Sequence, residues 1–169
     1  PQPPPSMRHD VSQPEAVAEL VERPLAWRSA IRQEGRAMTL EGINPDDLPT
    51  PQTYTHVIAA TGGRLIFVAG QEPEDSQGNV VGLGDLAAQA RQVFANLGRA
   101  LAAAGARTDQ VAKITILVVR HRPEYLPVIE TARISLFGDH KPVDTLVGVE
   151  SLARPEYLIE VDAIAVTDD

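Results

Sequence analysis

The residues best suited to do chemistry are two carboxylates on one strand near the end of the chain. Over residues 158–166 every second side chain is apolar, which predicts a strand with one face on a hydrophobic core. Glu160 and Asp162 fall on the other face. A carboxylate on a largely apolar sheet needs water, a counter-ion or a ligand. Glu160 is therefore a candidate catalytic or binding residue, and a solvated or salt-bridged side chain is the alternative.

Other reactive groups are missing or scattered. The chain has 0 cysteines, which excludes thiol catalysis, Cys-ligated zinc and iron–sulfur clusters. Its histidines show no i,i+4 pair and no nearby trio of acids, so we expect no metal site. They are His9, His56, His121 and His140. A short basic cluster, 120–122, ends a predicted strand and either faces a cleft or forms a solvated loop.

Composition narrows the class of protein. The 169 residues are 43% hydrophobic, enough for one domain with an appendage. Lys and Arg number 15 against 23 Asp and Glu, a net charge of -8 that disfavours binding to nucleic acid. Aromatic residues make up 4%, too few for a base-stacking surface. With no membrane-spanning apolar run and no signal-peptide pattern, we expect a soluble cytoplasmic protein without a membrane partner.

Proline divides the chain. Nine of the 14 prolines fall in the first 51 positions. This predicts a Pro-rich extension over residues 1–52, with short helices over 14–36 and a linker over 38–53. The main domain is expected over residues 53–169.

The elements that position Glu160 follow a regular order. Helices are predicted from Asp85, a typical N-cap, to Gly105, and from about residue 123 to Gly138. The predicted strands cover 54–60, 64–70, 111–119, 145–149 and 158–166, with the first two joined as a hairpin at 61–63. The order β-β-α-β-α-β-β predicts an α+β fold, in which one mixed sheet carries both helices on one face.

The second face of that sheet needs a cover. The strands over 64–70 and 111–119 are apolar on both sides. No part of the main domain remains to cover the second face. We therefore expect another copy of the chain there, in a closed symmetric oligomer. The alternative is that the N-terminal extension covers this face within the same chain.

Three stretches resemble the RidA/YjgF family in order and spacing: LIFVAGQ over 65–71, QARQVFANL over 89–97 and LIEVDAIA over 158–165. The resemblance runs from about residue 53 to 166. It implies a chorismate-mutase-like fold and a homotrimer with three small-molecule clefts between subunits. It also implies hydrolysis of reactive enamines and imines to keto acids and ammonia without a cofactor, a deaminase-like activity. The family is also described as L-PSP-type endoribonucleases.

The resemblance assigns roles to individual residues. Glu160 matches the acid that holds the hydrolytic water, and Tyr54 matches the tyrosine of the cleft. Gly70 and Leu146 match positions whose backbone amides contact the ligand. In the family's Pro-Ala-Arg-Ser/Thr motif, however, Asp144 replaces the arginine, ahead of Thr145.

The replacement changes the expected substrate. An arginine clamps a substrate carboxylate through two hydrogen bonds, whereas Asp144 beside Glu160 would repel it. Asp144 is alternatively a residue that caps amides or pairs with an arginine. Two hypotheses remain: a divergent hydrolase acting on a neutral or cationic imine, and a noncatalytic metabolite-binding or structural trimer. The family's cleft serine is Ala69 here, and a further polar position aligns with Ile129.

Overall fold

The computed structural model describes residues 37–168 of the chain. The short helices expected over 14–36 lie outside the described residues. The strands are β1 (Thr39–Ile43), β2 (Val57–Thr61), β3 (Arg64–Gln71), β4 (Val111–Val119), β5 (Val143–Val149) and β6 (Ile159–Thr167). The helices are α2 (Leu86–Ala103) and α3 (Leu126–Phe137). The 3-10 turn η2 (Thr108–Gln110) lies between α2 and β4, and the 3-10 turn η3 (Pro123–Tyr125) directly precedes α3.

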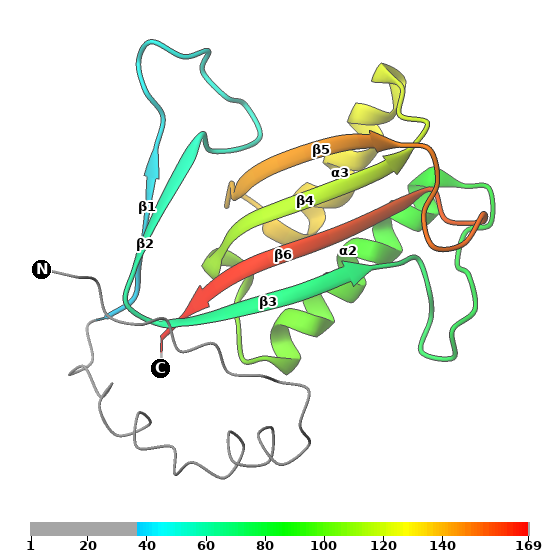
Figure 1. Ribbon diagram of the computed structural model, residues 1–169, viewed down its shortest axis with the longest axis horizontal. Coiled ribbons are helices and arrows are strands. Elements are labelled where there is room, and N and C mark those ends of the chain that lie inside the picture. The colour runs from blue at the N-terminus through cyan, green and yellow to red at the C-terminus, as the bar shows by residue number, and fades with distance from the viewer. Residues whose placement is uncertain (1–36, 169) are drawn as a thin grey trace, which may run out of the picture. The chain divides into compact units, whose positions relative to one another are not determined.

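The main sheet has the strand order β3-β6-β4-β5. The pair β4–β5 is parallel, and β6 is antiparallel to both of its neighbours. Figure 1 shows α2 and α3 together behind this sheet, so that no described helix covers its other face. This confirms the predicted α+β class with two helices on one face of a mixed sheet.

The predicted hairpin between the first two strands was wrong. β2 pairs with β1 in a separate antiparallel ribbon, and β3 pairs with β6. Gly62 and Gly63 do take positive φ, 71° and 73°, but the turn they form sends β3 into the main sheet, away from β2. β1 lies in the segment that we expected to be a linker, so part of that segment is regular strand.

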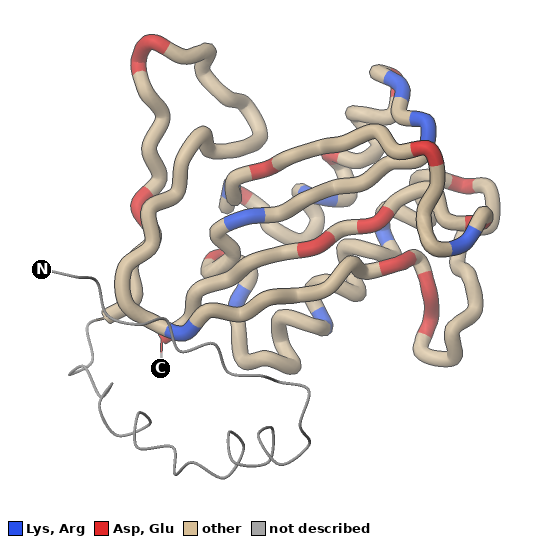
Figure 2. Tube along the Cα trace, in the orientation of Figure 1, with Lys and Arg blue, Asp and Glu red and all other residues tan. Residues whose placement is uncertain are grey.

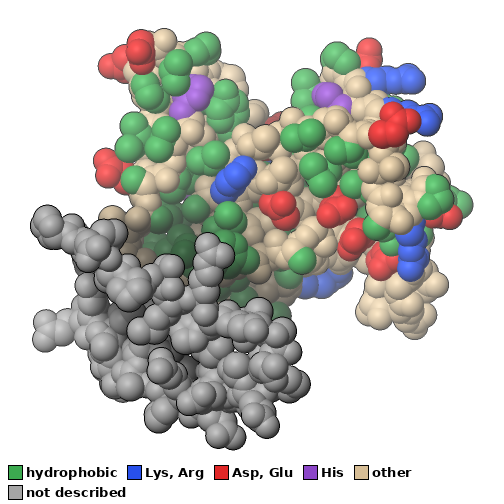
Figure 3. All heavy atoms as spheres, viewed as in Figure 1, with side chains coloured by type: hydrophobic (Ala, Val, Ile, Leu, Met, Phe, Trp, Pro, Cys, Tyr) green, Lys and Arg blue, Asp and Glu red, His purple; other side chains and the backbone are tan. Residues whose placement is uncertain are grey.

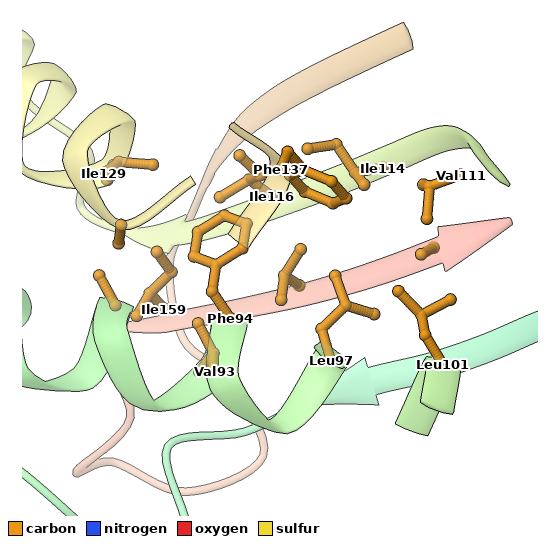
Figure 4. Close-up of a cluster of buried hydrophobic side chains, with 14 of the residues drawn as sticks. Val93, Phe94, Leu97, Leu101, Val111, Ile114, Ile116, Ile129, Phe137 and Ile159 are labelled. Carbon is orange, nitrogen blue, oxygen red and sulfur yellow. The ribbon is translucent and has the colours of Figure 1, made fainter. Parts of the chain in front are cut away.

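The core lies between the helices and the sheet. Asp85 caps α2 as predicted, because its Oδ1 accepts hydrogen bonds from the amides of Ala87 (2.9 Å) and Ala88 (3.1 Å). Figure 4 shows Phe94 and Leu97 of α2 packed toward the apolar side chains of the sheet. Phe137 of α3 meets Phe94 edge-on, with ring centroids 6.3 Å apart.

Strand β6 alternates as predicted. Its apolar residues at 159, 161, 163 and 165 are buried against the helices, whereas Glu160 and Asp162 face the uncovered side. The uncovered face is also rich in apolar side chains: Phe67 is 72% exposed, Leu65 58% and Val147 38%. Hydrophobic and acidic groups therefore share one surface (Figure 3).

Candidate functional site

The carboxylate of Glu160 lies directly over the backbone of Gly70. A Cβ atom added at Gly70 would overlap the Glu160 side chain, so only glycine leaves this space open. The register between β3 and β6 shifts between Val68 and Gln71, which makes a bulge at this point. Bulges often re-aim side chains near active sites, and this one gives Glu160 its position. The structure thus brings together two of the residues that the sequence singled out.

Glu160 sits in an acidic environment. Its pKa is raised above the usual glutamate value, mainly by partial burial and then by the charges of Glu72 and Asp162. Figure 2 shows the acidic positions along β6 and near the end of β3. A carboxylate with a raised pKa is a stronger base than an ordinary glutamate, and it can accept a proton from water and return it to a leaving group.

Asp144 lies on the opposite face of the sheet. In the parallel register it is aligned with Ile114, a buried core residue, so its side chain points toward α3. Its Oδ1 atom is buried without a hydrogen-bond partner among the described residues. The same is true of Nη1 of Arg133 on α3, although the guanidinium bonds to Glu130 through Nη2 (2.6 Å) and Nε (2.9 Å). A half-satisfied charge cluster therefore lies under strand β5.

Burial raises the pKa of Asp144 to about 6. The charge of Arg133 opposes that increase, Glu130 adds to it, and Lys113 opposes it. Near neutral pH this carboxyl exists in both protonation states. At this position the chain therefore holds an acid that can donate a hydrogen bond as well as accept one.

Tyr54, Thr145 and Leu146 surround the beginning of β5. Thr55, next to Tyr54, donates from Oγ1 to the carbonyl of Lys141 at 2.6 Å, which holds the tyrosine segment beside this strand. Thr145 is exposed on the uncovered face and accepts a hydrogen bond from Nζ of Lys113 at 3.1 Å. Leu146 packs against the core. Tyr54 itself meets the ring of His56 edge-on, with centroids 5.3 Å apart.

Within the chain the candidate residues form two groups. Glu160 is aligned through Leu117 with Val147, whereas Asp144 is aligned through Ile114 with Ala163. The two carboxylates thus lie on opposite faces and on strands two spacings, about 10 Å, apart. Gly70 and Glu160 make one group, and Tyr54 with 144–146 makes the other. Within the single chain the two groups do not form one site.

Sequence reasoning missed the buried Arg133. Its side chain is 2% exposed, and Ile129, which we aligned with a polar cleft position, is also 2% exposed and belongs to the core. The signal was present: Arg133 stands four residues from both Ile129 and Phe137. The helical period therefore places an arginine on the apolar stripe of α3. A charge on such a stripe needs a buried partner.

The described residues contain no group of three His, Asp or Glu side chains arranged to hold a metal ion. No helix in residues 37–168 is long and apolar enough to cross a membrane.

Comparisons with known proteins match the main domain of the chain. The family model described as Endoribonuclease L-PSP matches residues 46–167. A RutC family protein of Pyrococcus horikoshii is 33% identical over 126 residues, which covers 74% of this chain and 96% of that protein. A 3-aminoacrylate deaminase RutC of Acinetobacter baylyi is 30% identical and covers 76% and 98% respectively.

Solved structures share the fold of this chain. A Rid family protein of unknown function from Yersinia pestis superposes with a TM-score of 0.71 at 34% identity, over 75% of this chain and 98% of that chain. A protein described as a putative endoribonuclease of Thermotoga maritima gives a TM-score of 0.57 at 29% identity, over 76% and 98%.

Proposed function

Since this chain belongs to the endoribonuclease L-PSP family, which includes Rid and RutC proteins, we propose that it hydrolyses a small imine or enamine without a carboxylate group. The observation that carries the proposal is the Glu160 carboxylate, held over Gly70 with a raised pKa on the uncovered sheet face. The relative named for 3-aminoacrylate acts on a substrate that carries a carboxylate. Here Asp144 replaces the arginine that the resemblance assigns to binding that group.

The proposed reaction needs only water and the protein. Glu160 takes a proton from water as the oxygen adds to the C=N carbon, giving a carbinolamine. The nitrogen is protonated and leaves as ammonia, and the carbon becomes a carbonyl. An enamine enters the same path after tautomerising to its imine. No arginine is available at position 144 for a substrate carboxylate, and the charge on Asp144, whose pKa is about 6, disfavours an anionic substrate.

We further propose that the site forms between subunits of a homotrimer. Two observations support this. Glu160 and Gly70 lie apart from Tyr54 and Asp144 in one subunit. The face that carries Glu160 also exposes Phe67 and Leu65, which a partner subunit would cover.

A comparison of two imines of similar size tests the proposed activity. An amino acid oxidase acting on 2-aminobutanoate supplies the carboxylate imine, and a flavin amine oxidase acting on butylamine supplies the uncharged one. We expect the protein to accelerate ammonia release from the second imine, and Glu160→Gln to lower that acceleration at least a hundredfold. Preference for the carboxylate imine would contradict the proposed specificity, and no acceleration of either would contradict the hydrolase.

The second candidate is a noncatalytic metabolite-binding trimer. It is favoured by the loss of the arginine at position 144 and of the cleft serine at Ala69. In that case a small amine binds at the Glu160 site without turnover. Glu160→Gln then weakens binding of butylamine in calorimetry, while ammonia release stays at the uncatalysed rate with every imine.

A further inference from the structure

A basic cavity lies at the C-terminal ends of β4 and β5. It has a volume of about 440 Å³ and is formed by the turn after β4 and by the connection from β5 to β6. Figure 2 shows basic positions on the loops at this end of the sheet. Three of the lining residues are Arg120, Arg122 and Arg154, and Glu150 is the acidic one. Such a volume suits a small organic molecule.

Two of the arginines, Arg120 and Arg122, are available to a ligand. Arg120 and Glu150 approach only to 3.9 Å, and their side chains are 77% and 90% exposed, so their mutual attraction is weak. No acidic side chain of the described residues forms an ion pair with Arg122. In a chain of net charge -8, a cavity lined by three guanidiniums and one carboxylate is a local exception, even with Glu74 paired to Arg154 from outside the lining.

Arg154 is held in place before any ligand arrives. Its Nη1 bonds to Oε1 of Glu74 at 2.9 Å, and its guanidinium carbon lies 5.7 Å from the centre of the Tyr157 ring. Tyr157 in turn donates its hydroxyl to Glu74. A guanidinium fixed by an ion pair and an aromatic ring loses less conformational entropy when it binds an anion.

The backbone at Arg120 is strained. Its φ of 48° is the one positive value at a non-glycine position among the described residues. The amide of Arg120 donates to the carbonyl of Val149 at 2.9 Å, which fixes this conformation. Glycine would adopt this geometry without the cost. Strain retained at a side chain that lines a cavity points to a role for that side chain.

The start of α3 also borders the cavity. Tyr125 is the N-cap residue of this 12-residue helix, makes no side-chain hydrogen bond to the first turn, and lines the cavity. The Tyr125 ring offers a flat apolar wall.

We propose that this arginine pocket, defined by Arg120, Arg122, Tyr125 and Arg154, binds a small organic anion that combines a phosphate or carboxylate group with a flat apolar part. Guanidinium groups bind both kinds of anion through paired hydrogen bonds. The pocket is opposite in charge to the surroundings of Glu160. It is therefore a second site, separate from the proposed hydrolysis.

Calorimetric titration of the full chain tests the proposal with four probes: phenyl phosphate, benzoate, inorganic phosphate and neutral benzyl alcohol. We expect one of the two aromatic anions to bind at least tenfold more tightly than benzyl alcohol and inorganic phosphate. Tighter binding of phenyl phosphate identifies a phosphate site, and tighter binding of benzoate a carboxylate site. Equal binding of benzyl alcohol, or binding of no probe, would overturn the proposal.

Variants locate the binding. Arg122→Ala and Arg154→Ala should each weaken binding of the preferred anion at least tenfold. Arg107→Ala is the matched control, because it removes the same charge from an exposed residue that pairs with Asp109. An equal loss in Arg107→Ala would show general electrostatic attraction and contradict a built site.

Two further variants separate folding and hydrolysis from binding. Arg120→Gly should weaken binding of the anion. It should maintain or raise the melting temperature of the protein, since glycine relieves the backbone strain at this position. Undiminished binding in Arg120→Gly would remove that residue from the proposal. Glu160→Gln should bind the anion as the unaltered chain does, whether or not the proposed hydrolysis is confirmed. A loss there would mean that the two sites are one.

Discussion

Gly70 and Glu160 occupy one space on two neighbouring strands: the carboxylate lies where a side chain at position 70 would have to be. The bulge between Val68 and Gln71 turns this part of β3 out of regular register with β6. Glu160 is thereby held on the uncovered face beside Glu72 and Asp162, the charges that help to raise its pKa. The position of the acid and its protonation behaviour have one structural origin.

Gly70→Ala should displace the Glu160 carboxylate without unfolding the protein. The overlap involves the end of a flexible side chain, which can rotate away. Because a shift of about 1 Å in a catalytic group can cost about a hundredfold in rate, we expect a loss of that order in ammonia release. Circular dichroism should show a folded protein.

A double variant provides the control for that displacement. If Gly70→Ala acts through Glu160, then Gly70→Ala combined with Glu160→Gln should be no slower than Glu160→Gln alone. Additive losses would instead show that the two residues act independently.

The raised pKa of Glu160 predicts the acid limb of the rate profile. The proposed base must be ionised, so activity should be lost as the pH falls through a pKa above that of an ordinary glutamate. Glu72→Gln removes one of the two charges that raise the pKa, and should move the limb to lower pH. Glu41→Gln, a charge loss on β1 of the separate ribbon, is the matched control. A limb that moves equally in both variants would contradict the local interaction.

The raised pKa of Asp144 predicts that the free energy of unfolding depends on pH. A carboxyl whose pKa rises to about 6 on folding binds its proton more tightly in the folded state. Stability is therefore highest when the group is protonated, and falls as the pH rises from about 4 through 6. The pKa of Asp144 lies about two above the ordinary aspartate value, which corresponds to about 3 kcal/mol. Solvent screening of this partly exposed group reduces the penalty to about 2 kcal/mol at pH 8.

Asp144→Asn should remove this penalty. Urea unfolding should show the variant about 2 kcal/mol more stable than the unaltered chain at pH 8, and nearly equal to it at pH 4. Asp46→Asn changes the same charge on an exposed loop residue, and should leave the difference near zero at both pH values. A destabilised Asp144→Asn at pH 8 would mean that the attraction of Arg133 outweighs burial.

Local periodicity predicted the parts of the fold that depend on near neighbours. The alternation in β6 and the cap at Asp85 each depend on residues a few positions apart, and both were confirmed. The Gly62-Gly63 turn was found with positive φ, but its pairing was wrong, because β2 takes β1 as its partner. Which strand pairs with which depends on long-range packing that a turn motif does not contain.

The candidate site was predictable only in part for the same reason. Glu160 stands out in its own strand, and Gly70 follows from the family resemblance. The Asp144 side chain lies on the helix side of β5 because of the register between β5 and Ile114 of β4, and its pKa depends on Arg133 from α3. These relationships join residues that are far apart in the chain, so the sequence pointed to the two carboxylates without placing them on opposite faces.

The apolar side chains on the uncovered face predict how the proposed trimer is disrupted. Phe67 is 72% exposed in one subunit, and covering a phenylalanine contributes about 1.5–3 kcal/mol. Phe67→Asp replaces that gain with the cost of a buried charge at each copy of the interface. We expect the variant to sediment as a folded monomer. Leu83→Asp is the matched control, because Leu83 is equally exposed, at 73%, but lies in the connection before α2. It should remain a trimer, and an unaltered chain that sediments as a monomer would contradict the proposed assembly and, with it, a site shared between subunits.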